Sequence, residues 1–330
     1  MGNRDFVRIY RKILQRPLTV TAILFLLTFF LSLQTNEGLV LGEFRELKNC
    51  NATKLNFSPD EPAPIEGSVS QYFSLSVFDK ISAQAVIVLD PTTHTTLYAE
   101  NPDARLPPAS LTKVATALVV LQNMDLNQIA TVPENISEKA QGSLMGLLPG
   151  EKISVENLLW GTLLPSGNDA AHTLAVNFPG GYDVFVGEMN KLAIFLHLSN
   201  THFTNVMGFD DNKHYSSAYD LAILSEYALR NPLFAEVVGT AEKTVVSEHF
   251  FSPTTDHQPP TTHQQWHQLL NTNELLGQIK EINGVKTGYT QKAGECMIVS
   301  LYRNGKTFLI VLLGSKERLS DAGILIKAIK

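Results

Sequence analysis

A continuous apolar run over residues 114–121 follows a short polar stretch that begins with Pro107 and Pro108. A helix without a polar face belongs in the middle of a globular core. The two prolines stop whatever precedes them, and Ser110 is a favoured residue at a helix start, so we expect a helix to begin at about Ser110. The serine would then lie at the N-terminal tip of a buried helix.

Shorter apolar runs predict strands at both ends of the folded part. Residues 83–90 and 95–100 flank a turn and predict a hairpin. Residues 296–302 and 307–313 flank Asn304-Gly305, and this dipeptide between apolar runs is the strongest short hairpin signal. The last run is apolar almost throughout, as expected for a strand that is covered on both faces.

Helical patterns dominate the middle of the chain and return at its end. They cover residues 158–164, 182–198, 217–229 and 319–329, and Pro165 ends the first of them. Strands at both ends can meet in one antiparallel sheet, with the helices packed on it. We therefore expect the α+β class, an antiparallel β-sheet flanked by helices with a helical subdomain.

Residues 242–271 give a weaker signal. Residues 244–251 have some strand character, whereas 252–268 are rich in Pro, Thr, Gln and His and are interpreted as a loop. His263 and His267 have the spacing of metal ligands. Because no cluster of carboxylates or cysteines lies near them in sequence, we favour a solvated loop and expect no metal site.

The N-terminal segment combines basic and apolar residues in the order typical of membrane insertion. The apolar run 18–33 follows a basic cluster that ends at Arg16. This charge bias places the N-terminus in the cytoplasm and the rest of the chain outside it. The length lies between that of a signal peptide and a full span, and no favourable cleavage site follows, so we favour an uncleaved anchor over a cleaved signal peptide.

A polar, proline-containing stretch separates this segment from the folded part, as in a stalk or tether. We expect three parts: a cytoplasmic basic stretch and membrane segment over 1–34, a stalk over 35–72, and the folded domain over 73–330.

The composition argues against nucleic-acid binding and against a structure held by disulfides. The chain has 330 residues, 44% of them hydrophobic, and a net charge of -6. Such an acidic chain argues against a nucleic-acid surface. Its two cysteines are too few for a disulfide framework, and we interpret Cys296 as a small core residue rather than a nucleophile.

Candidate chemistry lies at the start of the buried helix. Three positions along a helix are nearly one turn, so the amine of Lys113 is expected beside the hydroxyl of Ser110. A serine needs a neighbour to take its proton, and a lysine can do so where burial disfavours its charged form. The alternative is a helix cap followed by a lysine that extends to solvent, because this tetrapeptide pattern is weak by itself.

Two further motifs favour the catalytic interpretation. Ser166-Gly167-Asn168 and Lys286-Thr287-Gly288 follow Ser110-x-x-Lys113 in the order found in penicillin-binding proteins and serine β-lactamases. The surrounding sequences, such as Leu164-Pro165 before Ser166, Asn271-Thr272-Asn273 and Tyr289-Thr290 after Gly288, extend this match. From about Ala83 onward the chain resembles the D-alanyl-D-alanine carboxypeptidases, which are low-molecular-mass penicillin-binding proteins.

The resemblance implies a β-lactamase/transpeptidase-like fold and a serine mechanism without a cofactor or metal. It implies that Ser110 is the nucleophile, that Lys113 takes its proton and that Ser166 passes a proton to the leaving amine. Asn168 would hold the substrate amide and the Lys113 side chain. The backbone N–H groups of Ser110 and Tyr289 would form the oxyanion hole.

The resemblance also implies how the substrate would bind. Lys286 would make the cleft electropositive for a terminal carboxylate, Thr287 would hydrogen-bond it, Gly288 would let the substrate lie against the strand, and Arg318 is the candidate for a further carboxylate contact. Expected partners are peptidoglycan stem peptides ending in D-Ala-D-Ala, β-lactam antibiotics as covalent inhibitors, and the membrane.

Many relatives carry a second β-rich domain and a C-terminal amphipathic anchor. The residues after Gly288 leave room for a hairpin and a last helix, so we expect neither feature here, with the N-terminal segment replacing the anchor. Three rival functions remain. They are a β-lactamase, a transpeptidase or endopeptidase, and a non-catalytic cell-wall binding protein. The β-lactamase is disfavoured because no Glu-x-x-Leu-Asn stretch lies between the second and third motifs.

Overall fold

The structure, a computed structural model, describes residues 81–251 and 261–330. The expected membrane segment and stalk lie outside these residues, as do the first residues of the expected domain. Among the described helices, none combines the length and apolar character needed to cross a membrane.

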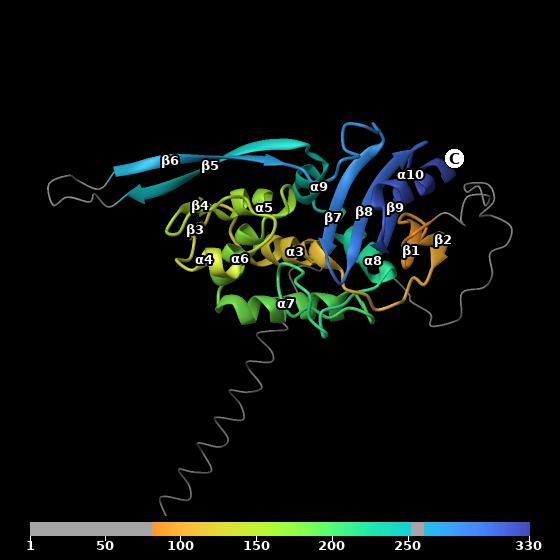
Figure 1. Cartoon of the computed structure of the whole chain (residues 1–330), viewed down its shortest axis with the longest axis horizontal. Helices are drawn as coiled ribbons and strands as arrows, with labels where there is room; N and C mark the ends of the chain where they lie inside the picture. Colours follow the sequence, from red (N-terminus) through yellow and green to blue (C-terminus); the bar gives the residue numbers. More distant parts are fainter. Residues whose placement is uncertain (1–80, 252–260) are drawn as a thin grey trace, which may run out of the picture. The chain divides into compact units, whose positions relative to one another are not determined.

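The described residues contain a five-stranded antiparallel sheet made from both ends of the folded part (Figure 1). Its strands in spatial order are β2 (Thr95–Glu100), β1 (Ala85–Asp90), β9 (Lys306–Ser315), β8 (Gly294–Arg303) and β7 (Ile282–Thr290). The predicted meeting of the terminal strands is confirmed. The predicted turn between β8 and β9 is confirmed too, because Asn304 and Gly305 both have positive φ angles of 53° and 78°.

Both faces of this sheet are covered. Along β9, Leu309, Val311 and Leu313 face one hydrophobic cluster, whereas Ile310 and Leu312 face another. The first cluster contains the helical subdomain and the second contains the last helix, α10 (Arg318–Ala328). Because side chains alternate along a strand, burial on both faces requires a continuous apolar sequence. This explains the uninterrupted apolar run.

The helical part lies between the two halves of the sheet in sequence. Its helices are α3 (Lys113–Asn123), α4 (Ile136–Lys139), α5 (Val155–Leu163), α6 (Asn168–Val176), α7 (Gly181–Phe195), α8 (Ala218–Leu229) and α9 (Pro232–Gly239). Local signals define several starts: Ser154 and Ser217 accept hydrogen bonds from backbone N–H groups at the start of α5 and α8. The sequence patterns did not predict α9.

The apolar helix starts slightly later than expected. Ser110 lies in a 3-10 turn, η4 (Ala109–Thr112), and the α-helix α3 begins at Lys113. Ala109 has a φ of 48°, in the left-handed region that alanine rarely adopts. Ser110 therefore lies in the turn that precedes α3 rather than in the α-helix itself, while residues 113–120 of α3 are buried as expected.

A second, four-stranded sheet corrects the loop prediction. Its order is β3 (Ile129–Thr131), β4 (Lys152–Ser154), β5 (Glu242–Phe251) and β6 (Thr261–Leu270). The predicted loop was therefore wrong over residues 261–268, which pair with β5 along the hairpin that Figure 1 shows reaching past α5. Polar residues on the exposed face of this strand gave it the composition of a loop.

His267 belongs to a buried polar cluster on this second sheet. Its Nε2 atom lies 2.5 Å from a carboxylate oxygen of Glu151, and the hydroxyl of Ser247 donates to the same oxygen. Burial would raise the pKa of Glu151, but these hydrogen bonds outweigh burial and lower it. Within the described ranges no three His, Cys, Asp or Glu side chains gather as a metal site would require. His267 thus ties β6 to the loop before β4.

Candidate active site

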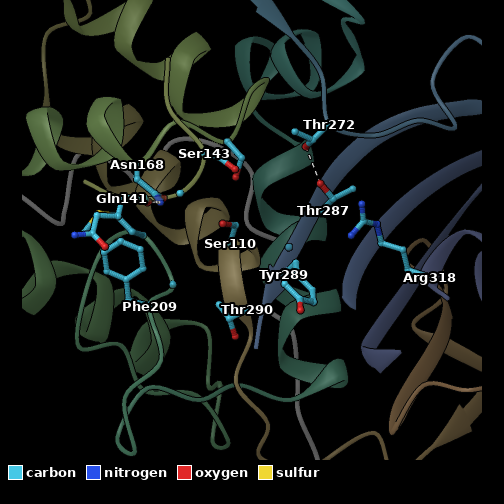
Figure 2. A pocket seen from close by; sticks show the side chains of 15 residues that line it. Ser110, Gln141, Ser143, Asn168, Phe209, Thr272, Thr287, Tyr289, Thr290 and Arg318 are labelled. Atoms are coloured by element: carbon cyan, nitrogen blue, oxygen red, sulfur yellow. Dashed lines mark hydrogen bonds between the residues drawn. The ribbon is translucent and has the colours of Figure 1, made fainter. Parts of the chain in front are cut away.

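A pocket of about 370 Å³ lies between the helical part and strand β7 (Figure 2). Ser110 lies at its centre, with Asn168 on the helical side and Thr287 and Arg318 on the sheet side. The structure brings all the predicted site residues to this region. All of them line the pocket except Lys113 and Lys286, which are buried behind its walls.

Backbone segments pack very closely around Ser110. A Cβ atom on Gly208 would lie 1.8 Å from the carbonyl oxygen of Ala109, and one on Gly288 would lie 2.9 Å from the Ser110 nitrogen. Gly288 is therefore required for the close approach of β7 to the serine. This is a second reason for glycine at this position, besides the expected room for the substrate against the strand. Its missing side chain keeps the space beside the Ser110 nitrogen free.

Lys113 meets the serine as the helical spacing predicted. Its side chain is fully buried, and its Nζ atom lies 3.0 Å from Ser110 Oγ, 2.7 Å from Asn168 Oδ1 and 3.0 Å from the Met207 carbonyl oxygen. A neutral amine has two N–H groups for the Asn168 and Met207 oxygens, and its lone pair can accept from the serine hydroxyl. Burial, and next the positive charge of Lys286, hold the pKa of Lys113 well below its usual 10.5. The amine is thus placed and tuned to accept the serine proton.

The second serine lies on the connection between α5 and α6. Ser166 has a φ of 62°, a left-handed conformation that is uncommon for serine, and its side chain is buried. Its Oγ atom has no hydrogen-bond partner in the described part of the chain, although it lines the pocket. A buried hydroxyl without a partner is costly, so this one is available to a ligand.

Asn168 and Asp169 hold the opposite wall together. The Asn168 side-chain amide donates to the Gln141 carbonyl, while its oxygen accepts from Lys113. The carboxylate of Asp169 accepts from the backbone N–H groups of Met145, Gly146, Leu147 and Ala170. The loop that carries Gln141 into the pocket is therefore fixed to the start of α6.

On the sheet side, Thr287 and Lys286 face different surroundings. Thr287 lines the pocket, and its hydroxyl lies 2.6 Å from that of Thr272. Lys286 is buried and donates to the Thr287 carbonyl at 3.0 Å. Burial, and next the charge of Arg318, lower its pKa to about 7. Lys286 therefore acts electrostatically from behind the wall rather than by direct contact with a ligand.

Arg318 reaches the pocket from the first residue of α10. Its guanidinium lies 3.5 Å from a Glu295 oxygen and 3.8 Å from a Glu274 oxygen. The Nε atom is buried and has no hydrogen-bond partner among residues 81–251 and 261–330. These loose ion pairs leave donor capacity for an anion in the pocket.

Tyr289 and Phe209 flank the open side of the pocket. Tyr289 is 65% exposed and Phe209 is 36% exposed, and both line the pocket. Figure 2 shows them on either side of Ser110. Two aromatic rings therefore form part of the pocket lining around the serine.

A hydrogen-bond relay behind Ser110 escaped sequence reasoning. The Thr204 N–H donates to Nδ1 of His214 at 3.0 Å, so the other ring nitrogen, Nε2, carries the proton in the neutral ring and donates to Thr112 Oγ1 at 2.8 Å. Thr112 in turn donates to the Ala109 carbonyl at 2.8 Å. The relay holds the residue whose positive φ presents Ser110, and burial lowers the pKa of His214 to about 4.

Sequence signals differ among the residues that were missed. Thr272 lies inside Asn271-Thr272-Asn273, and Asp169 directly follows Ser166-Gly167-Asn168, so both were within reach as candidates. Thr112 occupies an unspecified position of Ser110-x-x-Lys113, and His214 and Gln141 belong to no pattern that marks chemistry. Their roles arise from contacts between segments far apart in the chain, such as the 102 residues that separate Thr112 from His214.

Comparisons with known proteins agree with the geometry of the site. Residues 72–317 match the D-alanyl-D-alanine carboxypeptidase family. The chain is 34% identical to D-alanyl-D-alanine carboxypeptidase DacF of Bacillus subtilis, over 72% of this chain and 59% of that one. It therefore spans less than two thirds of the length of that relative.

Two further matches come from Streptomyces strain K15. A D-alanyl-D-alanine carboxypeptidase of that strain is 34% identical over 73% of this chain and 85% of its own. The crystal structure of the K15 DD-transpeptidase superposes with a TM-score of 0.68 at 33% identity, covering 76% of this chain and 97% of that chain. The match extends over nearly the whole length of the solved structure and shows the same fold.

Proposed function

Since the chain belongs to the D-alanyl-D-alanine carboxypeptidase family, a family of serine peptidases, we propose that it removes the terminal D-alanine from peptidoglycan stem peptides. One observation carries this proposal: the buried, pKa-lowered amine of Lys113 lies 3.0 Å from the hydroxyl of Ser110 at the centre of the pocket. This pair is a nucleophile with its base.

Acylation begins at this pair. Ser110 Oγ attacks the carbonyl carbon of the bond between the two D-alanines, and its proton passes to Lys113. The oxygen that becomes negative accepts hydrogen bonds from the backbone N–H groups of Ser110 and Tyr289, where loss of one such donor typically costs about 3 kcal/mol. The close approach of Gly288 to the Ser110 nitrogen supports this arrangement.

Departure of the terminal D-alanine needs a proton. The hydroxyl of Ser166, buried and without a partner in the described residues, donates it to the leaving amine and recovers it through Lys113. Asn168 holds the substrate amide with its side chain, which also fixes the Lys113 amine. Water then hydrolyses the ester on Ser110 and restores the enzyme.

The negative end of the substrate lies on the sheet side. The Thr287 hydroxyl donates a hydrogen bond to the terminal carboxylate, and Arg318 forms an ion pair with the same carboxylate. The charge of Lys286 adds attraction from behind the wall. β-Lactams carry a carboxylate and a reactive carbonyl in a similar arrangement, so they acylate Ser110 and block the site.

Product analysis tests this proposal. A peptide ending in D-Ala-D-Ala should yield free D-alanine with the wild-type enzyme and none with Ser110→Ala, and penicillin should add its mass to the wild-type protein but not to that variant. A cross-linked dimer as the main product would identify a transpeptidase instead. Intact motifs with no product and no penicillin adduct would identify a non-catalytic binding protein.

We further propose that residues 18–33 remain as a membrane anchor, with the N-terminus in the cytoplasm and the catalytic domain outside. The basic cluster before this apolar run and the unfavourable cleavage sites after it support the proposal. Full-length protein should fractionate with membranes, resist extraction by salt and be released by detergent. A mature N-terminus between residues 32 and 45 would show a cleaved signal peptide instead.

A further inference from the structure

Thr272 contributes a hydroxyl to the pocket that the mechanism above does not use. It lies on the turn between β6 and the segment leading to β7, and it lines the pocket beside Thr287 (Figure 2). The two Oγ1 atoms are 2.6 Å apart, a short hydrogen bond between hydroxyls. Thr287 is the residue proposed above to bind the substrate carboxylate.

The turn that carries Thr272 is rigidly held. Asn271 donates its side-chain amide to the carbonyls of Val238 and Thr240, and Asn273 donates to the Gly284 carbonyl at 3.1 Å. The Thr272 N–H donates to the Leu164 carbonyl at 3.0 Å, on the segment that leads to Ser166. The Thr272 hydroxyl is therefore presented to Thr287 by a fixed backbone, which links the two walls of the pocket.

Proton counting gives this hydroxyl pair a direction. Each hydroxyl has one proton, so one of the two threonines donates and the other accepts. If Thr287 donated to Thr272, it would have no proton left for a carboxylate. If Thr272 donates, the Thr287 proton is free to point into the pocket, and the hydrogen bond that it accepts polarises its own O–H.

The charges around the pair favour the second arrangement when an anion is bound. Arg318 and Lys286 both lie on this side, and the Arg318 Nε atom is buried without a partner in the described ranges. A carboxylate bound there accepts a hydrogen bond from the Thr287 hydroxyl. The oxygen of that hydroxyl then accepts a hydrogen bond from the Thr272 hydroxyl. A ligand end without negative charge gains little from this chain of hydrogen bonds.

We propose that Thr272 is a positioning residue for carboxylate recognition: it donates to Thr287 and orients the Thr287 proton toward the carboxylate next to the scissile bond. This inference rests on the proposed carboxypeptidase function and assigns the residue that sets the preference for a free carboxylate. It predicts that Thr272 acts on binding of a charged end and leaves the chemistry at Ser110 unchanged.

The test uses two variants of the full chain. Thr272→Val keeps the shape of the side chain and removes the hydroxyl, whereas Thr272→Ser keeps the hydroxyl. On a peptide ending in D-Ala-D-Ala, Thr272→Val should raise KM about tenfold with kcat within twofold, since loss of the hydrogen bond that orients the Thr287 donor has roughly this effect. Thr272→Ser should stay within twofold of the wild type in both constants.

A charge-dependent readout separates positioning from simple packing. Acylation rates are measured by intact mass with a penicillin and with its uncharged methyl ester over long incubations. Thr272→Val should slow the acid about tenfold and the ester less than twofold. Equal slowing of acid and ester in Thr272→Val would overturn the role. A peptide KM of Thr272→Val within twofold of the wild type, or a KM of Thr272→Ser as high as that of Thr272→Val, would overturn it too.

Failure of this inference is distinguishable from failure of the proposed function. If the wild-type enzyme releases no D-alanine and forms no penicillin adduct, the function itself is wrong. If the wild type does both and Thr272→Val behaves like it, the function stands and the role of Thr272 is excluded. Thermal unfolding of both variants checks that the turn is intact, and a melting temperature close to that of the wild type is expected.

Discussion

The two walls of the pocket hold their key side chains in different ways. On the helical wall, the Lys113 amine is fully buried and has three hydrogen-bond partners within 3.0 Å. On the sheet wall, the guanidinium of Arg318 pairs with carboxylates at 3.5 and 3.8 Å, one of them on Glu274, whose side chain is 57% exposed. One wall is dry and closely bonded, and the other keeps loose contacts beside solvent.

This difference matches two tasks. Proton transfer from Ser110 needs an amine whose charged form is disfavoured, and this requires burial on the helical wall. Recognition of a carboxylate needs a charged group that can exchange its partners, and this requires looser pairing on the sheet wall. Changes on the helical wall should therefore stop chemistry, while changes on the sheet wall should weaken binding of charged substrates.

The largest effect is expected at Lys113. Lys113→Arg replaces an amine that can be neutral with a guanidinium, and it removes the base because a guanidinium does not give up its proton at ordinary pH. Penicillin acylation, followed by intact mass, should slow by about a thousandfold or more. Lys191→Arg on the exposed surface of α7 is the matched control and should acylate at the wild-type rate. Rapid acylation of Lys113→Arg would remove Lys113 as the base.

A second test on the same wall concerns the His214 relay. Its folded pKa of about 4 lies below the ordinary 6.5, so the unfolded chain binds a proton that the folded protein excludes as the pH falls from about 6.5 to 4. Stability is full above pH 6.5 and should drop by up to about 3 kcal/mol across this window. NMR of the His214 ring should show it neutral at pH 5.5, and a ring that titrates near 6.5 would contradict the relay.

On the sheet wall, Arg318 should have a smaller and more selective effect. Arg318→Gln should lower kcat/KM on a D-Ala-D-Ala peptide about 30-fold, corresponding to about 2 kcal/mol, because a charge-assisted hydrogen bond is lost. The loss should fall mainly on KM. Arg230→Gln removes an exposed arginine with an ion pair of its own and should leave both constants unchanged. A loss confined to kcat would instead connect Arg318 to the chemistry.

Sequence reasoning worked where function depends on neighbours along the chain. The contact between Ser110 and Lys113 follows from three positions of helical spacing, and the strand β9 follows from an apolar run buried on both faces. It failed where the partner is distant. Thr272 and Thr287 are 15 residues apart and Thr112 and His214 are 102 apart, and no pattern in the sequence places either pair together.

The same limit explains the wrong loop over residues 261–268. A strand that pairs along one edge and exposes one face needs only alternate buried residues, such as His267 and Leu269. The polar side chains between them gave the composition of a loop. Tertiary pairing with β5 supplied the order that the local sequence did not indicate.

The smallest effect is expected at Cys296, which lies on β8 in register with Gly288 of the neighbouring strand β7. The thiol is fully buried, and burial raises its pKa to about 12, so it has neither the access nor the charge of a nucleophile. Cys296→Ala should keep penicillin acylation within twofold and lower stability by about 1 kcal/mol through lost packing. Native protein should resist iodoacetamide at pH 8. Labelling of Cys296 within minutes would show that β8 opens. The sheet wall would then owe its looser contacts to backbone motion rather than to the exposure of Glu274 and Glu295 beside Arg318.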